Sequence, residues 1–284
     1  MTQIGQYTLH TIETGRLGLD GGAMFGIVPK ALWERRIPSD NANRIPLNMR
    51  CLLLESSDRL ILIDNGLGDK YSDRFAELYA IEDSEMNLPG ALQSAGFSLE
   101  DVTDVILTHL HFDHCGGSTT RDGDQLQVAF PNAQYLVQKG HWEWANVSNV
   151  REKGSFLAEN LNPLADSGQL ALIDGTKELF PGVDVIPVDG HTKNMQIVKI
   201  SDAERTLVFV ADLLPTHAHL SPAWNMAYDL WPMTTIEEKE NFLKDVVDRG
   251  WQLFFEHDPE IAVADVEMTE RGPKVTNPRP LDEL

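Results

Sequence analysis

The chain has 284 residues, a length typical of one or two domains. Its 42% hydrophobic and 24% charged residues are ordinary for a globular protein, which excludes disorder as a general description. The 44 acidic residues outnumber the 23 lysines and arginines and give a net charge of −21. A surface this acidic repels phosphate backbones and anionic membranes. We therefore expect no nucleic-acid or membrane partner, whereas such a surface admits neutral or cationic small molecules more easily.

Cysteine content and the start of the chain indicate where the protein works. The two cysteines, Cys51 and Cys115, cannot form a disulfide framework, which fits a reducing compartment. The first residues, MTQIGQYTLHTIETG, lack a basic region followed by an apolar core and so do not resemble a secretory signal. No apolar run reaches the roughly 18 residues of a membrane-spanning helix. We expect a cytoplasmic protein.

Short apolar runs bounded by turn residues dominate the chain and predict strands. In chain order they cover 49–56, 59–64, 103–109, 133–138, 169–174, 183–188, 196–201, 205–212 and 251–258. A helical segment near 88–96 precedes the third run. The most distinct helix covers 235–249, with Thr234 or Thr235 as its cap and Gly250 at its end. Strands that alternate with helices, without a linker, predict a single α/β domain over residues 1–284.

The two halves of the chain resemble each other. The first predicted hairpin ends at Asp64 and the second at Asp212. In each half a helix and then a strand follow, and that strand ends in a histidine, His109 or His257, 45 residues after the aspartate. This pattern predicts two pseudo-equivalent halves whose strand ends face one cleft, where ligands of α/β sheets gather.

Metal-ligating side chains are concentrated in residues 108–117, which read THLHFDHCGG. Gly116 and Gly117 would allow a tight turn, and we expect Cys115 to be a small buried residue rather than a ligand. Imidazole and carboxylate groups suit zinc, while iron, manganese or cobalt would also bind. Within six residues lie four candidate ligands, too many for one tetrahedral ion but suited to two divalent ions: His109, His111, Asp113 and His114.

At this motif the chain resembles the metallo-β-lactamase-fold hydrolases, whose signature is H-x-H-x-D-H followed by a distant His, a distant Asp and a C-terminal His. The resemblance covers roughly residues 50 to 260 and implies an αββα sandwich. It also implies that His109, His111 and His191 hold the first metal ion, that Asp113, His114 and His257 hold the second, and that Asp212 bridges the two. Asp64 would lie behind the ligands and orient an imidazole. One departure is that many relatives continue G-H-T-P-G-H, whereas this chain reads GHTKNM and lacks the second histidine.

Within this superfamily the chain is most similar to the branch of N-acyl-homoserine-lactone lactonases and organophosphate hydrolases. We expect neither the signal peptide of secreted β-lactamases nor, with 27 residues after His257, the C-terminal helical domain of glyoxalase-II-type thioesterases. The acidic charge also argues against the cationic substrate path of the nucleases in this fold. Residues 21–30 and 212–231 look like corresponding segments of the lactonase branch.

Two segments, 20–48 and 213–233, are rich in apolar residues and predict either a pocket for a small neutral or hydrophobic substrate or a subunit interface in a homodimer. His217 and His219 follow Asp212 closely enough for one of them to hydrogen-bond a substrate. Tyr228 could supply an oxyanion-stabilising hydroxyl, although core packing is the competing interpretation. His141, near Trp142 and Trp144, is expected to pack in a helix.

These features lead to a dinuclear hydrolase that opens a lactone or a similar neutral ester. Two ions about 3.5–4 Å apart share a water, lower its pKa towards about 7 and provide a hydroxide that attacks the carbonyl carbon. Asp113 could carry the proton to the leaving group. A phosphotriesterase or phosphodiesterase would use the same metal centre and is the alternative. A non-catalytic metal-binding protein is a third hypothesis, against which the retained Asp212 argues.

Overall fold

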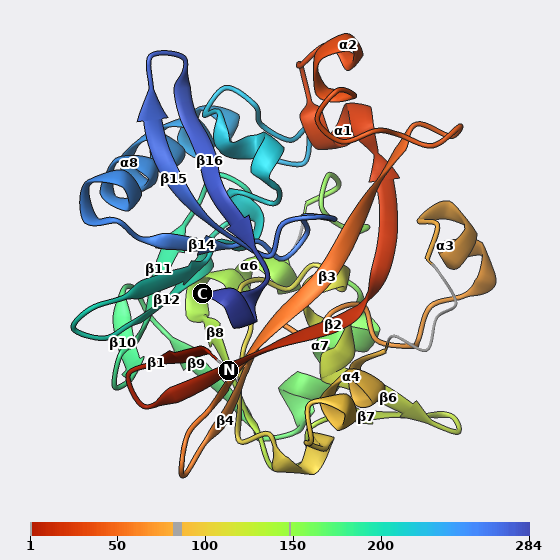
Figure 1. Cartoon of the computed structure of the whole chain (residues 1–284). Helices are drawn as coiled ribbons and strands as arrows, with labels where there is room; N and C mark the ends of the chain where they lie inside the picture. The colour runs from red at the N-terminus through yellow and green to blue at the C-terminus, as the bar shows by residue number, and fades with distance from the viewer. Residues whose placement is uncertain (1, 82–86, 148) are drawn as a thin grey trace.

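Two seven-stranded sheets form the centre of the computed structural model, which describes residues 2–81, 87–147 and 149–284 (Figure 1). Across the first sheet the strands are β1 (Thr2–Ile4), β2 (Tyr7–Asp20), β3 (Arg44–Glu55), β4 (Leu60–Ile63), β5 (Asp104–Ile106), β8 (Gln134–Gln138) and β9 (Leu170–Ile173). Across the second they are β10 (Lys177–Phe180), β11 (Val183–Val188), β12 (Met195–Ser201), β13 (Thr206–Phe209), β14 (Gln252–Phe254), β15 (Val263–Thr269) and β16 (Gly272–Arg279). A separate hairpin pairs β6 (Thr119–Asp122) with β7 (Gln125–Val128).

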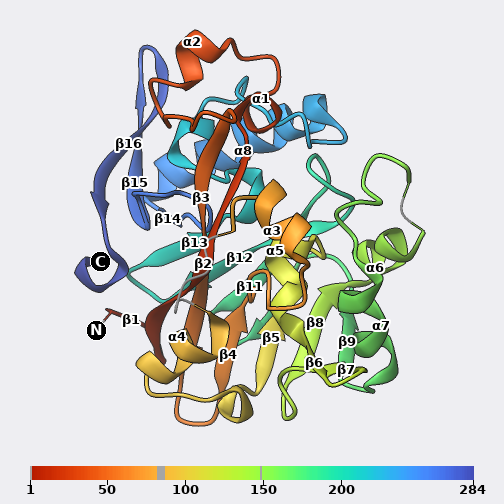
Figure 2. The same cartoon turned by 90° about the vertical axis from the view of Figure 1, so that its right-hand side faces the viewer.

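Helices occupy the connections between these strands (Figure 2). The longest, α8, links β13 to β14 and has an apolar stripe that includes Leu243 and Val246. The α-helices of the described residues are α1 (Gly21–Phe25), α2 (Lys30–Trp33), α3 (Asp73–Leu78), α4 (Leu88–Ser94), α5 (Phe112–Cys115), α6 (Lys139–Asn146), α7 (Ala158–Asp166) and α8 (Pro232–Arg249).

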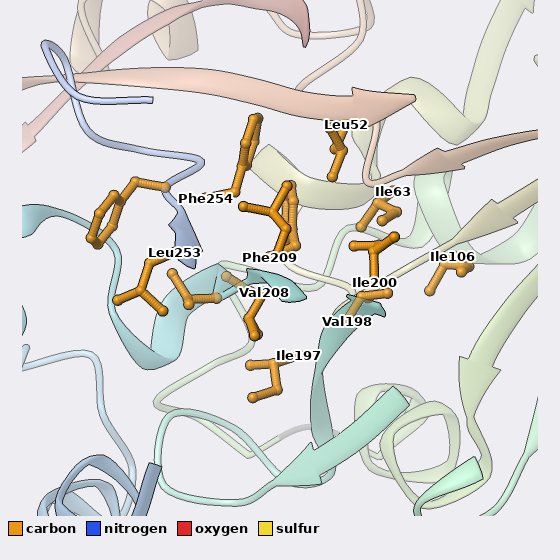
Figure 3. Close-up of a cluster of buried hydrophobic side chains, with 14 of the residues drawn as sticks. Leu52, Ile63, Ile106, Ile197, Val198, Ile200, Val208, Phe209, Leu253 and Phe254 are labelled. Carbon is orange, nitrogen blue, oxygen red and sulfur yellow. The ribbon is translucent and has the colours of Figure 1, made fainter. Parts of the chain in front are cut away.

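Alternating side chains place the first sheet between two apolar layers. Leu52 and Ile63 belong to the buried cluster of Figure 3, together with Phe209 of the second sheet. Their neighbour Leu53 points the other way, into a cluster that contains Leu92 of α4 and residues of α6 and α7. Since successive side chains of a strand point to opposite faces, one apolar run serves both layers. With α8 packed on the second sheet, the layers are helix, sheet, sheet, helix, which confirms the expected αββα sandwich.

Pairing in the two sheets confirms the two-half pattern. The strand β3 pairs antiparallel with β4, which pairs parallel with β5. In the second sheet β12 pairs antiparallel with β13, which pairs parallel with β14. The strands β5 and β14 each end three residues before the histidine of their half, His109 or His257. Both histidines therefore lie just beyond a strand end rather than within the strand.

Several local features differ from the sequence prediction. Helix α8 begins at Pro232, so Thr234 and Thr235 lie inside it, because a proline fits the first helical turn without losing a hydrogen bond. Its end at Gly250 is confirmed, since this glycine is left-handed with φ 66°. The long strand β2, the hairpin β15–β16 and the short helices α1 and α2 were not among the predicted elements. In the described residues, no helix has the length and apolar character to cross a bilayer.

Candidate metal centre

The motif of residues 108–117 follows β5 directly. His109 and His111 lie in the irregular segment between β5 and α5, whereas Asp113 and His114 lie on α5. Gly116 has no left-handed backbone; instead, a Cβ there would lie 2.0 Å from the carbonyl oxygen of Leu67. The two glycines are therefore needed for close packing against residues 65–67, rather than for the tight turn that the sequence suggested.

The other three candidate ligands come from the second half of the chain. His191 follows β11, Asp212 lies in the turn after β13, and His257 follows β14. Their side chains meet those of the motif, and all seven residues are at most 8% exposed. The prediction that both halves direct their strand ends to one place thus describes the observed arrangement.

Four of these side chains form a first group of ligand atoms. The Nδ1 atom of His111 lies 3.1 Å from Nε2 of His109 and 3.2 Å from Nε2 of His191. Asp212 completes the group, with its Oδ2 atom 3.1 Å from Nε2 of His191. Three imidazoles and one carboxylate therefore direct donor atoms into one small volume.

A second group lies beside the first and consists of Asp113, His114 and His257. The Nε2 atoms of the two histidines are 3.0 Å apart, and Oδ2 of Asp113 lies 3.9 Å and 3.8 Å from them. Asp212 reaches this group as well. Its Oδ2 lies 3.7 Å from Nε2 of His114, and its Oδ1 lies 3.3 Å from Nε2 of His257. The Asp212 carboxylate therefore stands between the two groups.

Hydrogen bonds behind the rings determine which nitrogen of each histidine faces inward. Nδ1 of His257 lies 2.8 Å from the carbonyl oxygen of Asn48, and Nδ1 of His191 lies 3.0 Å from Oδ1 of Asp229. Both partners are acceptors, so each Nδ1 carries the hydrogen. The inward Nε2 atoms of the two rings therefore present lone pairs when the rings are neutral.

Asp64 determines the orientation of two further imidazoles, as the sequence suggested. Its carboxylate accepts hydrogen bonds from the backbone N–H and the hydroxyl of Thr108, at 2.7 Å and 2.6 Å, and lies 3.1 Å from Nδ1 of His114. Because the Thr108 hydroxyl donates to Asp64, its oxygen accepts from Nδ1 of His109, 3.1 Å away. Both rings then turn Nε2 lone pairs toward the centre.

The arrangement of donors fits metal ions. Lone pairs on His114 and His257 that face each other at 3.0 Å repel unless a cation lies near both. Buried Oδ1 of Asp212 has no hydrogen-bond partner, although buried polar atoms almost always have one. Divalent ions held by the two groups would satisfy these atoms, and the mixture of imidazole and carboxylate suits zinc, iron, manganese or cobalt.

The buried carboxylates and histidines of the centre shift one another's pKa values. Burial, the largest effect, would raise the pKa of Asp212, but the surrounding histidines hold it well below its usual range. Burial lowers the pKa of His109 well below the ordinary value. For His257, burial is outweighed by the nearby Asp212 carboxylate, and its pKa is raised to about 9. In the metal-free protein, protons on some of these histidines therefore balance the carboxylates.

A cavity of about 290 Å³ opens onto five of the candidate ligands, His111, Asp113, His191, Asp212 and His257. Tyr228 lines it, is 39% exposed, and has a pKa raised to about 12 by burial, so its hydroxyl stays protonated. Polar side chains from one further segment, residues 151–155, also reach the cavity. Most of the remaining wall is apolar and consists of Leu19, Met24, Leu47, Tyr79, Phe112, Met226 and Ala227.

Residues 46–263 match the metallo-beta-lactamase superfamily, which is more than half of the chain. The chain belongs to this superfamily. An N-acyl homoserine lactonase of Bacillus thuringiensis is 25% identical over 282 residues, covering 95% of this chain and 90% of that protein. One from Bacillus cereus is 28% identical over 177 residues, which are 59% of this chain and only 64% of that protein's length.

Solved structures share the metallo-beta-lactamase fold along the whole chain. A probable metal-dependent hydrolase from Staphylococcus aureus superposes with a TM-score of 0.89 at 29% identity and covers 98% of both chains. A dizinc quorum-quenching lactonase in complex with a product has a TM-score of 0.82 at 23% identity, covering 98% of this chain and 96% of its own. The family and fold expected from the motif are thus confirmed.

Two residues expected near the substrate have other partners. Nδ1 of His217 lies 2.6 Å from Oδ2 of Asp258, and His217 does not line the cavity formed by the described residues. His219 is fully buried, stacks on Phe25 and donates from Nε2 to the carbonyl oxygen of Met24 at 2.8 Å. Burial lowers the pKa of His219 to about 3, so the ring is neutral. Both histidines therefore have partners within the protein, and the contact of either with a substrate stays a prediction.

The two apolar segments divide between pocket and core. Met24 and Leu47 of 20–48, and Met226 to Tyr228 of 213–233, line the cavity. Phe25 and Trp33 are instead buried and stacked on each other. Exposed apolar side chains such as Ile27 and Met233 remain on the same segments. A homodimer through them stays a prediction.

Sequence reasoning missed three buried carboxylates next to the ligands. Asp229 orients His191, Glu256 lies 3.0 Å from Nδ1 of His114, and Glu152 lies 3.6 Å from Nε2 of His111. A charged residue inside the apolar run WQLFFEHD could have indicated Glu256. Asp229 and Glu152 lie in irregular segments whose local sequence gives no such signal.

Proposed function

We propose that this protein is a dinuclear metal-dependent hydrolase that opens a lactone or a similar neutral ester, with zinc as the best-suited ion. The observation that carries the proposal is a pair of adjacent donor groups, joined by Asp212, at the base of a largely apolar cavity. Relatives named N-acyl homoserine lactonase support the choice of substrate class. The ligand assignment is the one that the sequence motif implied.

Each part of the cavity has a proposed task. Two divalent ions held by the two groups would supply a shared water of lowered pKa and polarise the ester oxygen. Asp113, which lines the cavity, would carry a proton to the leaving oxygen. Tyr228 donates its hydroxyl hydrogen to the carbonyl oxygen as negative charge develops there.

Substrate class follows from the wall of the cavity. Leu19, Leu47 and Met226 provide apolar surface on which an acyl chain loses contact with water. The net charge of −21 disfavours polyanionic substrates, because a negative surface potential lowers their local concentration. A neutral ester with an apolar substituent satisfies both conditions.

The decisive experiment combines metal analysis with a substrate panel. Purified protein should contain close to two metal ions per chain and should hydrolyse acyl lactones faster than phosphotriesters. Asp212→Asn should abolish hydrolysis, whereas Asp248→Asn, at an exposed ion pair on α8, should leave it unchanged. Metal-loaded protein that leaves all lactones intact would refute the substrate class. Faster turnover of phosphotriesters would establish the alternative hydrolase, and cellular function that survives in Asp212→Asn would favour a non-catalytic role.

A further inference from the structure

Residues 149–156, between α6 and α7, lie against the first group of ligands. Arg151, Glu152 and Ser155 line the cavity, and the ring of Phe156 lies 4.9 Å from the ring of His111. Arg151 also hydrogen-bonds the carbonyl oxygens of residues 227 and 229. The segment is thus tied to the cavity wall on one side and to a candidate metal ligand on the other.

Glu152 is the buried centre of this segment, with 4% exposure. Its Oε1 accepts a hydrogen bond from the hydroxyl of Thr192 at 2.5 Å. Its Oε2 accepts from the indole N–H of Trp144 at 2.7 Å and from the side-chain amide of Asn149 at 3.1 Å. Three donors on one buried carboxylate hold it in the charged form and in a fixed position.

His111 differs from the other candidate histidine ligands in the nitrogen that it turns inward. Its Nδ1 faces Nε2 of His109 and of His191, while its buried Nε2 points outward without a hydrogen-bond partner. The nearest carboxylate oxygen to that Nε2 is Oε1 of Glu152, 3.6 Å away. For a lone pair to face inward on Nδ1, the hydrogen must be on Nε2, where a negative charge stabilises it.

We propose that Glu152 is a positioning residue of the metal centre, which keeps the hydrogen of His111 on Nε2 and so keeps the Nδ1 lone pair directed at the first ion. The same carboxylate ties His111 to Thr192, the residue after His191, and to Trp144. Trp144 in turn contacts Trp231 of the apolar segment 213–233, with ring centres 5.6 Å apart. The proposal rests on the proposed metal centre, but it does not depend on the substrate being a lactone.

Glu152→Gln tests the proposal because glutamine has the same shape but one acceptor oxygen. Glutamine cannot accept from Thr192 and Trp144 through different atoms, and it removes the negative charge beside His111. Affinity for Zn²⁺ is measured by competition with a chromophoric chelator in the absence of substrate. We expect one of the two ions to bind roughly 10–100-fold more weakly, as for other residues that orient metal-binding histidines, and the other to bind as before. The absorption spectrum of Co²⁺-loaded protein should also change.

Two variants serve as controls. Trp144→Phe removes one donor to Glu152 but leaves the carboxylate beside His111, so both affinities should stay within a few-fold of those of the wild type. Glu143→Gln, on the exposed face of α6, should change nothing. Should Glu152→Gln fail to fold, Glu152→Asp keeps the charge but withdraws it from His111 and should weaken the same ion.

The proposal is overturned if Glu152→Gln binds both ions normally with an unchanged Co²⁺ spectrum. It is also overturned if Trp144→Phe weakens metal binding as much as Glu152→Gln does. A general loss of packing in residues 149–156 would then explain both results. Because the affinities are measured without substrate, inactivity toward lactones would refute the proposed function and leave this result intact.

Discussion

Lys239 is a buried lysine on α8 that connects this helix to the cavity-forming segment 213–233. It is 1% exposed, and its Nζ atom donates to the carbonyl oxygens of His219 at 3.2 Å and Trp224 at 3.0 Å. The side-chain oxygen of Asn225 lies 3.4 Å away. These three acceptors are uncharged, so they compensate only in part for the removal of an ammonium group from water.

Burial lowers the pKa of Lys239 from the ordinary 10.5 to about 8. Below pH 8 both the folded and the unfolded chain hold the proton, so the cost of burying the charge has its full value and stability does not change with pH through this group. Between pH 8 and 10.5 only the unfolded chain holds it, so the free energy of unfolding rises with pH. At roughly 1.36 kcal/mol per pKa unit, the full rise is about 3 kcal/mol.

The assay is urea denaturation of the wild type and of Lys239→Met from pH 7 to pH 10.5. Taking the difference between the two proteins cancels the titration of all other groups. We expect the wild type to gain about 3 kcal/mol on the variant across this range, with most of the gain above pH 8. Lys244→Met, at an exposed position on the same helix, should show no such gain. A difference for Lys239→Met that stays constant with pH would refute the reasoning.

Three further predictions concern the metal centre and the cavity. Asp229→Asn should weaken the binding of one metal ion roughly 10–100-fold, as measured by competition with a chelator. The two oxygens of Asp229 accept from His191 Nδ1 and from the backbone N–H of Met226, whereas asparagine has only one acceptor oxygen. Unchanged affinity would contradict this. His257 has a pKa raised from 6.5 to about 9, so its folded form binds the proton more tightly than the unfolded chain does. This proton stabilises the metal-free protein fully below pH 6.5, and the contribution is lost as the pH rises to 9. Metal binding must displace that proton, so calorimetry in buffers of different ionisation enthalpy should detect proton release below pH 9, and its absence would count against the prediction. Tyr228→Phe should lower kcat for a lactone by roughly 10²–10³ with little change in KM, and an unchanged kcat would exclude the hydroxyl from the reaction.

The candidate ligands were predictable because their signal is local or ordered along the chain. Four of them lie within six residues, and the resemblance to the superfamily implied the other three from their order along the chain. The repeat of Asp64 and His109 in Asp212 and His257 also predicted two matching halves, which the strand pairing confirms. Each of these patterns depends on spacing within one stretch of chain or within one half, and spacing is visible without coordinates.

The tertiary structure alone decided which residues stand behind the ligands. His257 is oriented by the carbonyl oxygen of Asn48, which is 209 positions away, and His219 is directed into the core by Met24, 195 positions away. Such contacts depend on how the sheets and the irregular segments pack, and packing distances leave no periodic trace in the sequence. The sequence by itself therefore predicted two matching halves and an acidic protein, and its resemblance to the superfamily implied the αββα fold and the candidate ligand set. Only the packed chain decided the inward nitrogen of each histidine, the contacts of Glu152 and the shape of the cavity.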